Sequence, residues 1–367
     1  HSTSRRQRQM CIRDRIYNHM SENIILSTAT VIEALNKLEF IENKVYTLFV
    51  LDKRTLQLIG TLTDGDIRRY LINGGSVNGS ICDAMNTNFK YILGTDKNTL
   101  SNLHKFRELG IWVIPVLDNE KHIIEVFNLR THKSLLPIDA VLMAGGKGER
   151  LRPLTEKIPK PLVKVGDKCI IDYNIDRLIE YGVKHINVTV NYLKEQMHEH
   201  FTKPFNGVKV TTIEEPKFLG TIGSVQFVKK FYNDTVLLMN SDLFTNIDFE
   251  DFYLHFKEHN AMMSVAAVPY NVNIPFGILD LNGRNIKGLL EKPNYNYYAN
   301  GGIYLIKREA LDLIPKDEFF NATDLIERLI GNNHRVIRYP LNGTWIDIGQ
   351  QADLAKAREL VKHLNNK

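Results

Sequence analysis

Cysteine, long apolar runs and net charge are all scarce in this chain of 367 residues. The three cysteines, Cys11, Cys82 and Cys169, are widely spaced and odd in number, which matches neither a disulfide framework nor a metal-ligand pattern. No apolar run approaches the roughly 20 residues of a membrane span, and no signal-peptide pattern opens the chain. With 43% hydrophobic residues, the composition favours a globular, cytoplasmic protein without a membrane partner.

The positive charge is concentrated at the beginning of the chain. The formal net charge is +5, and residues 1–15, with five Arg and one Asp, account for +4 of it. The rest is close to neutral, so the charge balance does not predict nucleic acid as a partner. Residues 1–16 lack apolar periodicity, and we expect them to be a disordered or non-native leader.

The length favours two domains, and residues 17–136 form the first. Apolar runs at 46–52 and 58–62 are repeated at 112–118 and 122–127, some 66 residues later. Apolar residues at helical spacing precede each pair of runs, at 31–38 and 100–106. We therefore expect an α+β domain of two helix-strand-strand-helix copies, at about 20–85 and 86–136, with a linker helix at 80–85.

The second domain, residues 137–367, alternates strand and helix patterns. Strands are predicted at 138–144, 185–190, 208–213 and 235–239, and a helix at 171–181 has an apolar stripe that stops at Gly182. This alternation indicates an α/β, Rossmann-like fold whose mostly parallel sheet is covered by helices, with ligands at the carboxyl ends of the strands. A closing helix is expected within 351–367.

The segment 138–164, IDAVLMAGGKGERLRPLTEKIPKPLVK, is the most informative part of the chain. A buried strand runs into a loop that contains Gly145, Gly146 and Gly148, and six basic residues lie within the twenty positions from 145 to 164. Glycines let backbone N–H groups approach an anion, and Arg and Lys neutralise it. The spacing is neither that of a P-loop nor that of a dinucleotide-binding fold. It predicts a phosphate-binding loop of another kind.

Residues 142–161 resemble the signature G-G-x-G-x-R-L-x-P-L-T-x-x-x-P-K-P of the sugar-1-phosphate nucleotidylyltransferases, and match it at every fixed position. Enzymes of that family join a nucleoside triphosphate to a sugar 1-phosphate and release pyrophosphate. The resemblance implies catalytic roles for Arg150 and Lys160. It also implies that Mg²⁺ is held by Asp242, just after the strand at 235–239, and by Asp347, in Trp-Ile-Asp-Ile-Gly.

The segment 213–223 resembles the part of these enzymes that reads the base, and the residue facing the base is then Glu215. A carboxylate can accept both N1–H and N2–H₂ of guanine, whereas uracil and thymine present carbonyl oxygens that would repel it. Glu215 therefore favours GTP. A one-residue shift of the alignment would put Glu214 in its place, and the alternative is that Glu214 or Glu215 simply solvates the loop. The nucleotide-binding residues implied are Leu142, Ala144, Gly145, Gly146, Gly148, Glu215, Gly220 and Thr221.

The sugar site is expected in the second half of this domain. Residues 276–290 read as a hairpin with a turn at Asn282-Gly283, followed by Glu-Lys-Pro at 291–293. By resemblance, the glutamate accepts hydrogen bonds from sugar hydroxyls and the lysine meets the sugar phosphate. The sugar-binding residues implied are Gly277, Glu291, Lys292, Asn300 and Gly302.

The first copy of the repeat ends in Gly60-Thr-Leu-Thr63-Asp-Gly-Asp66, which resembles the closing motif of a CBS (cystathionine β-synthase) repeat. The resemblance implies that Thr63 and Asp66 face an adenine nucleotide. The second copy has Asn128 and Thr131 at these places and lacks the carboxylate. One nucleotide site or none is expected, and a tandem CBS pair that only packs and dimerises is the alternative.

The function expected is transfer of GMP from GTP to a sugar 1-phosphate, giving a GDP-sugar for bacterial surface glycans. The domain order resembles the glucosamine-1-phosphate guanylyltransferases of legionaminic acid synthesis, and mannose 1-phosphate and heptose 1-phosphate are the nearest other substrates. The alternatives are an enzyme that uses UTP, dTTP or CTP, and a nucleotide-sensing regulator without catalysis. The sequence leaves the hexose and a homo-oligomeric state open.

Overall fold

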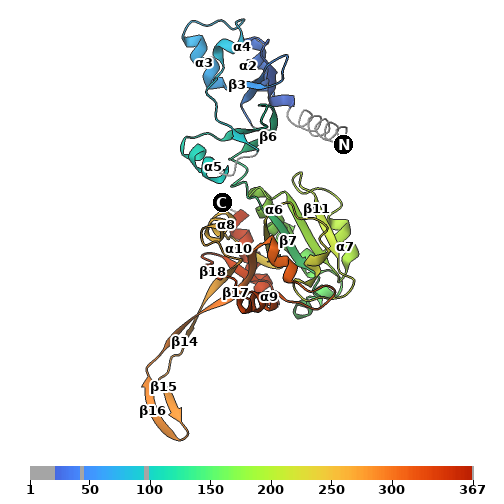
Figure 1. Cartoon of the computed structure of the whole chain (residues 1–367), viewed down its shortest axis with the longest axis vertical. Helices are drawn as coiled ribbons and strands as arrows, with labels where there is room; N and C mark the ends of the chain where they lie inside the picture. Colours follow the sequence, from blue (N-terminus) through green and yellow to red (C-terminus); the bar gives the residue numbers. More distant parts are fainter. Residues whose placement is uncertain (1–20, 42–44, 95–98, 366–367) are drawn as a thin grey trace. The chain divides into compact units, whose positions relative to one another are not determined.

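The computed structural model describes residues 21–41, 45–94 and 99–365, and the chain divides into two compact units, His1–Ser134 and Leu135–Lys367 (Figure 1). The expected leader at 1–16, with Cys11, lies outside the described residues. In the part of the chain that is described, no helix has both the length and the apolar character needed to cross a bilayer.

The first unit contains two small three-stranded sheets of the same topology. In each, the first strand pairs parallel with the second and the second pairs antiparallel with the third. The elements of the first half are η1 (Ser21–Asn23), β1 (Ile24–Leu26), α2 (Val31–Glu39), β2 (Leu48–Leu51), β3 (Leu58–Leu62), α3 (Asp64–Ile72) and α4 (Ile81–Ala84). Those of the second half are β4 (Ile92–Leu93), α5 (Thr99–Glu108), β5 (Val113–Leu117) and β6 (Ile123–Asn128).

The two halves share even an irregularity of their ladders. The register shifts between Val50 and Leu51 in β2, and between Val116 and Leu117 in β5, at positions 66 residues apart. Such bulges are specific features of a strand rather than accidents of pairing. The repeat seen in the sequence is thus also a repeat of backbone geometry.

The expected closing helix of the second copy is wrong. The first copy ends in α3, which Thr63 and Asp66 start with a capping box, but no helix lies between β6 and residue 139. Asn128 stands at the place of Thr63, and its side chain accepts the Arg130 N–H in a local turn instead. The second copy has no acidic partner there for a capping box, and the chain continues as a loop.

The second unit is built on a seven-stranded mixed sheet of order β11-β10-β7-β12-β17-β14-β18. Four strands on one side are parallel, β17 runs antiparallel to both its neighbours, and β18 pairs parallel with β14. The strands are β7 (Asp139–Ala144), β10 (His185–Val190), β11 (Val210–Glu214), β12 (Thr235–Asn240), β14 (Met263–Asn273), β17 (Asn294–Lys307) and β18 (Val336–Pro340).

Helices and short ribbons complete this unit. Short ladders join β8 (Lys164–Val165) to β9 (Lys168–Cys169), β13 (Leu243–Thr245) to β19 (Trp345–Asp347), and β15 (Ile278–Asn282) to β16 (Asn285–Leu290). The helices are η2 (Glu149–Leu151), η3 (Leu154–Glu156), η4 (Lys160–Leu162), α6 (Ile170–Glu180), α7 (Lys194–His200), η5 (Gly223–Phe227), α8 (Phe249–Glu258), η6 (Arg308–Leu313), α9 (Ala322–Gly331) and α10 (Gln351–Asn365).

Both faces of the sheet are buried. Val141, Val236 and Leu238 project from one face into a core shared with Leu325 and Leu329 of α9. Because side chains alternate along a strand, Ala140 and Leu142 project from the opposite face, and they too are fully buried. The mostly parallel α/β sheet expected from the sequence is confirmed for this unit.

The carboxyl ends of the four parallel strands meet at one edge of the sheet, which is where ligands bind in this architecture. The chain leaves β7 for β10 on one side and later returns to β12 on the other side. Such a reversal of strand order opens a crevice between the loops that follow the strands. The fold therefore positions the loops after β7, β10, β11 and β12 around one space.

Candidate active site

A cavity of about 650 Å³ lies at this edge of the sheet. It is lined by the loop after β7, by Asn191 after β10, by Glu215 after β11, and by Ser241 and Asp242 after β12. Eleven of the residues singled out from the sequence bear on it. Ten line it directly, namely Ala144, Gly145, Gly146, Gly148, Arg150, Lys160, Glu215, Gly220, Thr221 and Asp242, and Asp347 lies beside two of them.

Leu142 does not line the cavity. It lies inside β7, opposite Val188 of β10 and Met239 of β12, and its side chain is fully buried. A central strand position of this kind uses its backbone groups in the ladders on both sides. Leu142 thus supports the sheet from which the glycine loop emerges.

Two of the three loop glycines, Gly145 and Gly148, lie where an added side chain would clash, whereas Gly146 has open space around it. A side chain at Gly145 would come within 2.6 Å of Oε1 of Glu215, so the glycine leaves space for that carboxyl group. Gly148 has φ +64° and lies against Lys160, whose Cβ would be 2.9 Å from an added side chain. Its carbonyl accepts a hydrogen bond of 2.8 Å from Thr155 Oγ1. The loop is thereby fixed against the Pro-Lys-Pro segment, with φ > 0 at Gly148 tolerated best by glycine.

Asp242 and Asp347 are brought together by a ladder that the sequence spacing does not reveal. Strand β13 begins at Leu243 and pairs with β19 so that Leu243 lies opposite Asp347. The Ile348 N–H donates to the carbonyl of Asp242, at 3.2 Å, and continues this contact. Two carboxylates that are distant in the sequence therefore lie at one point of the cavity rim.

The side chain of Asn174, in α6, fixes the backbone on both sides of Asp242. Its side-chain amide is 1% exposed and donates to the carbonyls of Ser241, at 3.3 Å, and Leu243, at 2.9 Å. These two residues flank Asp242. Sequence reasoning missed Asn174, because a polar residue in the apolar stripe of a helix was the only signal.

Two cations face the two carboxylates. Lys160 Nζ donates to Asp242 Oδ2 and lies 3.9 Å from Asp347 Oδ1, and the lysine is largely buried. The guanidinium of Arg150 packs over Gly349, where an added side chain would lie 3.2 Å from it. Burial and then the nearby Asp242 raise the pKa of Asp347, while Lys160 and Arg150 act in the opposite direction.

This cluster has the chemistry of a Mg²⁺ site. Mg²⁺ prefers carboxylate oxygens together with phosphate oxygens and water, and Asp242 and Asp347 supply the carboxylates where the glycine loop would hold phosphates. Two adjacent carboxylates favour a cation between them, and the ammonium group of Lys160 neutralises part of their charge. The donor set therefore fits the metal expected from the sequence.

Glu215 and Glu214 have different surroundings. Glu214 is exposed and paired with Lys194, at 2.8 Å, and with His198, at 2.9 Å. Glu215 is 5% exposed in the cavity wall, and among the described residues its Oε2 has no hydrogen-bond partner. Burial raises the pKa of Glu215, while two donors near its carboxyl group, the Ser224 hydroxyl and the Leu219 backbone N–H, act in the opposite direction. A buried acceptor without a donor is costly unless a ligand supplies one.

Gly220 and Thr221 connect the base segment to α9. Gly220 has φ +79° and lies against the carbonyl of Phe320, where an added side chain would be 2.7 Å away. Thr221 Oγ1 accepts the Ala322 N–H at 2.8 Å, and the Thr221 N–H donates to Asn321. Both residues line the cavity, and both also anchor the start of a helix.

The structure brings only two of the five predicted sugar residues near the cavity. Gly302 packs against the side chain of Asn240, which lines the cavity, and Asn300 accepts the Gly302 N–H at 3.0 Å. Gly277, Glu291 and Lys292 lie together elsewhere, beyond the ends of β14 and β17, and are exposed. The expected hairpin is confirmed as the β15–β16 pair with a turn at 283–284.

The two CBS-motif residues bond to each other in the first unit. Thr63 Oγ1 and the Thr63 N–H both donate to Asp66 Oδ2, at 2.6 and 2.9 Å. Asp66 also pairs with Arg69, and both residues line a cleft of about 850 Å³ with Met85 and Asn86. Helix capping thus accounts for these contacts without a ligand.

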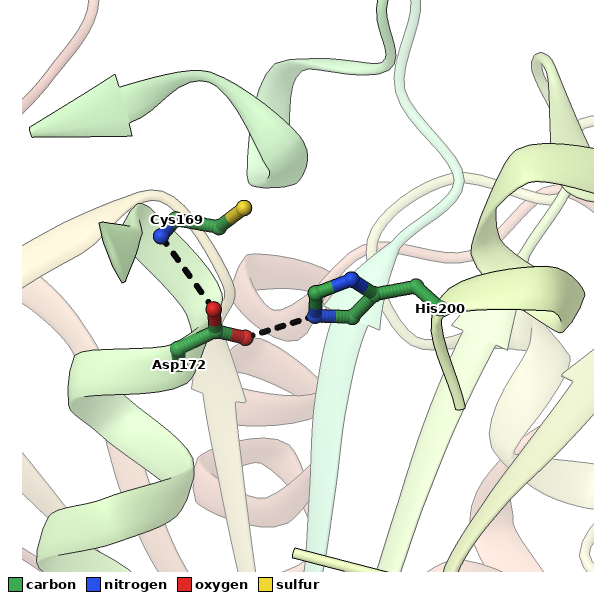
Figure 2. Close-up of side chains that lie close together, drawn as sticks. All are labelled: Cys169, Asp172 and His200. Carbon is green, nitrogen blue, oxygen red and sulfur yellow. Dashed lines mark hydrogen bonds and ion pairs between the residues drawn. The ribbon is translucent and has the colours of Figure 1, made fainter. Parts of the chain in front are cut away.

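Among the described residues, two clusters with metal-ligand chemistry lie outside the cavity. One is formed by Asp118, Glu120 and His122, between β5 and β6, and its residues are exposed or half-buried. The other is formed by Cys169, Asp172 and His200 (Figure 2). Ligand atoms of Cys169, Asp172 and His200 lie within 4.8 Å of one another, although no spacing of the cysteines predicted it. Both oxygens of Asp172 are already used, one by the Cys169 N–H and one by His200 Nε2 at 2.7 Å. Burial raises the pKa of Cys169 to about 11, which favours the thiol. The cluster is complete as the cap of α6, and we assign no metal to it.

Fold and cavity together describe an α/β unit with a phosphate loop, two cations and two carboxylates at the strand ends. Residues 139–363 match the family of nucleotidyl transferases, and the chain belongs to this family. The match leaves the first unit uncovered.

The chain is also similar to individual relatives and to a solved structure. The chain is 34% identical over 230 residues to the bifunctional protein GlmU of Methanocaldococcus jannaschii, covering 60% of this chain and 54% of that protein. It is 31% identical over 223 residues to mannose-1-phosphate guanyltransferase 2 of Candida glabrata, covering 58% and 62%. The structure of HddC from Yersinia pseudotuberculosis is similar with a TM-score of 0.47 and 24% identity, over 61% of this chain and 99% of that one. The chain thus spans little more than half the length of these curated relatives.

Proposed function

We propose that the protein is a Mg²⁺-dependent sugar-1-phosphate guanylyltransferase, which transfers GMP from GTP to a hexose or hexosamine 1-phosphate. The observation that carries the base preference is Glu215, a buried carboxylate in the cavity wall whose Oε2 lacks a donor. Guanine offers two adjacent N–H donors to such a group. The likeness to a mannose-1-phosphate guanyltransferase supports the same class of reaction.

In the reaction we propose, an oxygen of the sugar phosphate attacks the α-phosphorus of GTP in line. A new P–O bond forms as the bond to the bridging oxygen breaks, and pyrophosphate leaves with both electrons of that bond. Arg150 binds the leaving phosphates and Lys160 stabilises the charge that develops at the α-phosphate. Catalysis is then positioning and electrostatic stabilisation, without a nucleophilic side chain.

Asp242 and Asp347 would hold the metal, which when bound neutralises phosphate oxygens at the reacting phosphorus. Lys160 exchanges its contact with Asp242 for the α-phosphate as the substrate enters. The loop at 145–148 binds phosphate oxygens through backbone N–H groups. Ser241 fixes the other side, because its hydroxyl donates to the Met143 carbonyl at 2.7 Å and ties the loops after β7 and β12 together.

The test is a matrix of GTP, UTP, dTTP, CTP and ATP against mannose, glucosamine, glucose and heptose 1-phosphates, with pyrophosphate release as the readout. We expect turnover with GTP and one sugar phosphate, only in the presence of Mg²⁺. Turnover with UTP alone would contradict the role of Glu215 and leave the reaction class intact. Binding of GTP without pyrophosphate release from any pair would favour a nucleotide sensor.

We further propose that the first unit is a tandem CBS pair that binds an adenine nucleotide in the first copy and regulates the transferase. The two bulges 66 residues apart support the tandem pair, and the position of Asp66 in the cleft with Met85 and Asn86 supports a ligand site in the first copy. Changed transferase kinetics on addition of AMP or ATP would support regulation. The GDP-sugar product would serve surface glycan synthesis, and a cytoplasmic location follows from the two phosphorylated substrates.

A further inference from the structure

Strands β14 and β17 continue beyond the sheet as a two-stranded ribbon (Figure 1). Strand β18 pairs with β14 only as far as Ala267, and β12 pairs with β17 only as far as Ile303. From there, no other strand of the described residues pairs with the ribbon, and it ends in the β15–β16 hairpin. We call residues 268–299 the arm.

One face of the tip of the arm is apolar and exposed. Leu279 lies opposite Leu289, and Leu281 lies opposite Ile286, so these four side chains share a face of the hairpin. Each is exposed by 49 to 62%. An isolated two-stranded hairpin is only marginally stable in water, and a contiguous apolar patch of this kind marks an interaction site.

The arm also holds the sugar-recognition residues away from the cavity of their own chain. The ladder is continuous from Ala267–Asn300 to Asn273–Asn294, and Ile278–Leu290 begins the hairpin beyond it. The six residue steps from Asn300 to Asn294, at about 3.3 Å each, carry the ribbon roughly 20 Å from the sheet, and Glu291 lies beyond that end. Glu291 cannot reach the cavity beside Gly302 unless this ladder breaks.

We propose that the arm docks on a second copy of this chain and brings Glu291 and Lys292 to the cavity of that copy. The inference rests on the proposed transferase function and on the sugar-binding roles that the resemblance implies for these two residues. An identical cavity exists on every copy, and a reciprocal exchange of arms gives a closed dimer with two equivalent sites. It also removes the apolar face of the hairpin from water.

Two exposed aromatic side chains at the edge of the cavity offer an apolar surface for such an arm. Phe218 lines the cavity and is 54% exposed, and its ring lies 5.8 Å from that of Phe319, which is 58% exposed. Two exposed aromatic side chains beside a polar cavity match the apolar face formed by Leu279, Leu281, Ile286 and Leu289. Glu291 and Lys292, at the base of the hairpin, would then supply the polar contacts.

Complementation between two inactive variants tests this arrangement in the full-length protein. Asp242→Asn removes a metal ligand, and Glu291→Gln removes the acceptor for the sugar; each variant alone should have only a few per cent of wild-type turnover at subsaturating sugar phosphate. In a mixed dimer, the intact cavity of the second variant receives the intact arm of the first. Statistical mixing of a two-fold dimer should then restore about a quarter of wild-type activity.

The outcomes separate this inference from the proposed function. If Glu291→Gln is impaired and mixing restores nothing, the arm serves its own chain and the exchange is refuted. If Glu291→Gln keeps the wild-type KM for every sugar phosphate, the sugar role of Glu291 fails, and the molar mass in solution decides docking. The double variant Leu281→Asp, Leu289→Asp should then be a monomer, whereas Leu254→Asp, at an exposed position of α8, should remain dimeric. A monomeric wild type refutes the exchange.

Discussion

Glu215 determines the proposed base preference, and Glu214 is its natural control. We expect Glu215→Gln to lower kcat/KM for GTP by about 10- to 100-fold, because a buried hydrogen bond to a charged group contributes roughly 1.5–3 kcal/mol. Glu214→Gln should change it little, since Glu214 is exposed and bound to Lys194 and His198. Steady-state kinetics with GTP and UTP measure both. Equal losses in the two variants would contradict the assignment of Glu215.

The same residue predicts a pH dependence of stability. Burial raises the pKa of Glu215 above its ordinary value of 4.5, so the folded protein keeps this proton to a higher pH than the unfolded chain does. Its contribution to stability is full below pH 4.5 and is lost as the pH rises through the raised pKa. Glu215→Gln, which cannot ionise, should therefore be more stable than wild type at neutral pH. Urea titrations of both proteins across pH check the sign.

The ammonium group of Lys160 lies near both Asp242 and Asp347 and reduces the repulsion between them. Without it, Asp242 and Asp347 repel each other directly, and we expect Lys160→Ala to reduce kcat by about 10²–10³-fold, as loss of one transition-state donor does. Because Lys160 opposes the raised pKa of Asp347, its removal should move the acidic limb of the pH–rate profile to higher pH. Lys157→Ala, in the same loop but exposed, should leave kcat and the profile unchanged. If the acidic limb does not shift in Lys160→Ala, Lys160 does not influence the pKa of Asp347.

At the scale of elements, the apolar patterns of the sequence predicted those helices and strands that form by burying their own apolar residues. Strands β7, β10 and β12 and helices α6 and α10 lie within one or two residues of their expected places, because each buries an apolar run or stripe. The β13–β19 ladder that joins Asp242 to Asp347 depends on pairing across a hundred residues, which periodicity does not encode. The arm was missed for a related reason, since its strands read as sheet strands until their neighbours are known.

Helix α6 positions the metal ligands through Asn174. We expect Asn174→Ala to lower the free energy of unfolding by about 1–3 kcal/mol, because it leaves buried carbonyls of Ser241 and Leu243 without a donor. The released loop should also weaken metal binding, so kcat should fall and be partly restored by excess Mg²⁺. KM for the sugar phosphate should change less than kcat. A loss of stability with unchanged Mg²⁺ dependence would make Asn174 purely structural.

Because the first unit has two capping boxes, variants of both can distinguish helix capping from nucleotide binding. Thr30 and Glu33 start α2 with the same contacts that Thr63 and Asp66 make at α3. Thr30→Ala and Thr63→Ala should therefore destabilise this unit by similar amounts, about 1 kcal/mol each. Only Thr63→Ala should weaken the binding of AMP or ATP, measured by calorimetry on the full chain. If both variants weaken binding equally, or if the wild type binds no nucleotide, the role of Thr63 is only to cap α3.

At the scale of the whole molecule, two compact units predict two separable responses to ligands. A ligand that binds only the native state stabilises its own unit, by about 2.7 kcal/mol at a hundredfold excess over Kd. GTP with Mg²⁺ should therefore slow amide hydrogen exchange in residues 135–365, and AMP or ATP should slow it in residues 21–134. If the first unit regulates the second, each ligand must also change the affinity for the other by the same factor, since linkage is reciprocal. Protection confined to the binding unit, with unchanged affinities, would show two independent units and exclude regulation of binding. Protection that spreads from the AMP unit into the loops around Glu215 and Asp242 would instead identify the elements that carry the coupling.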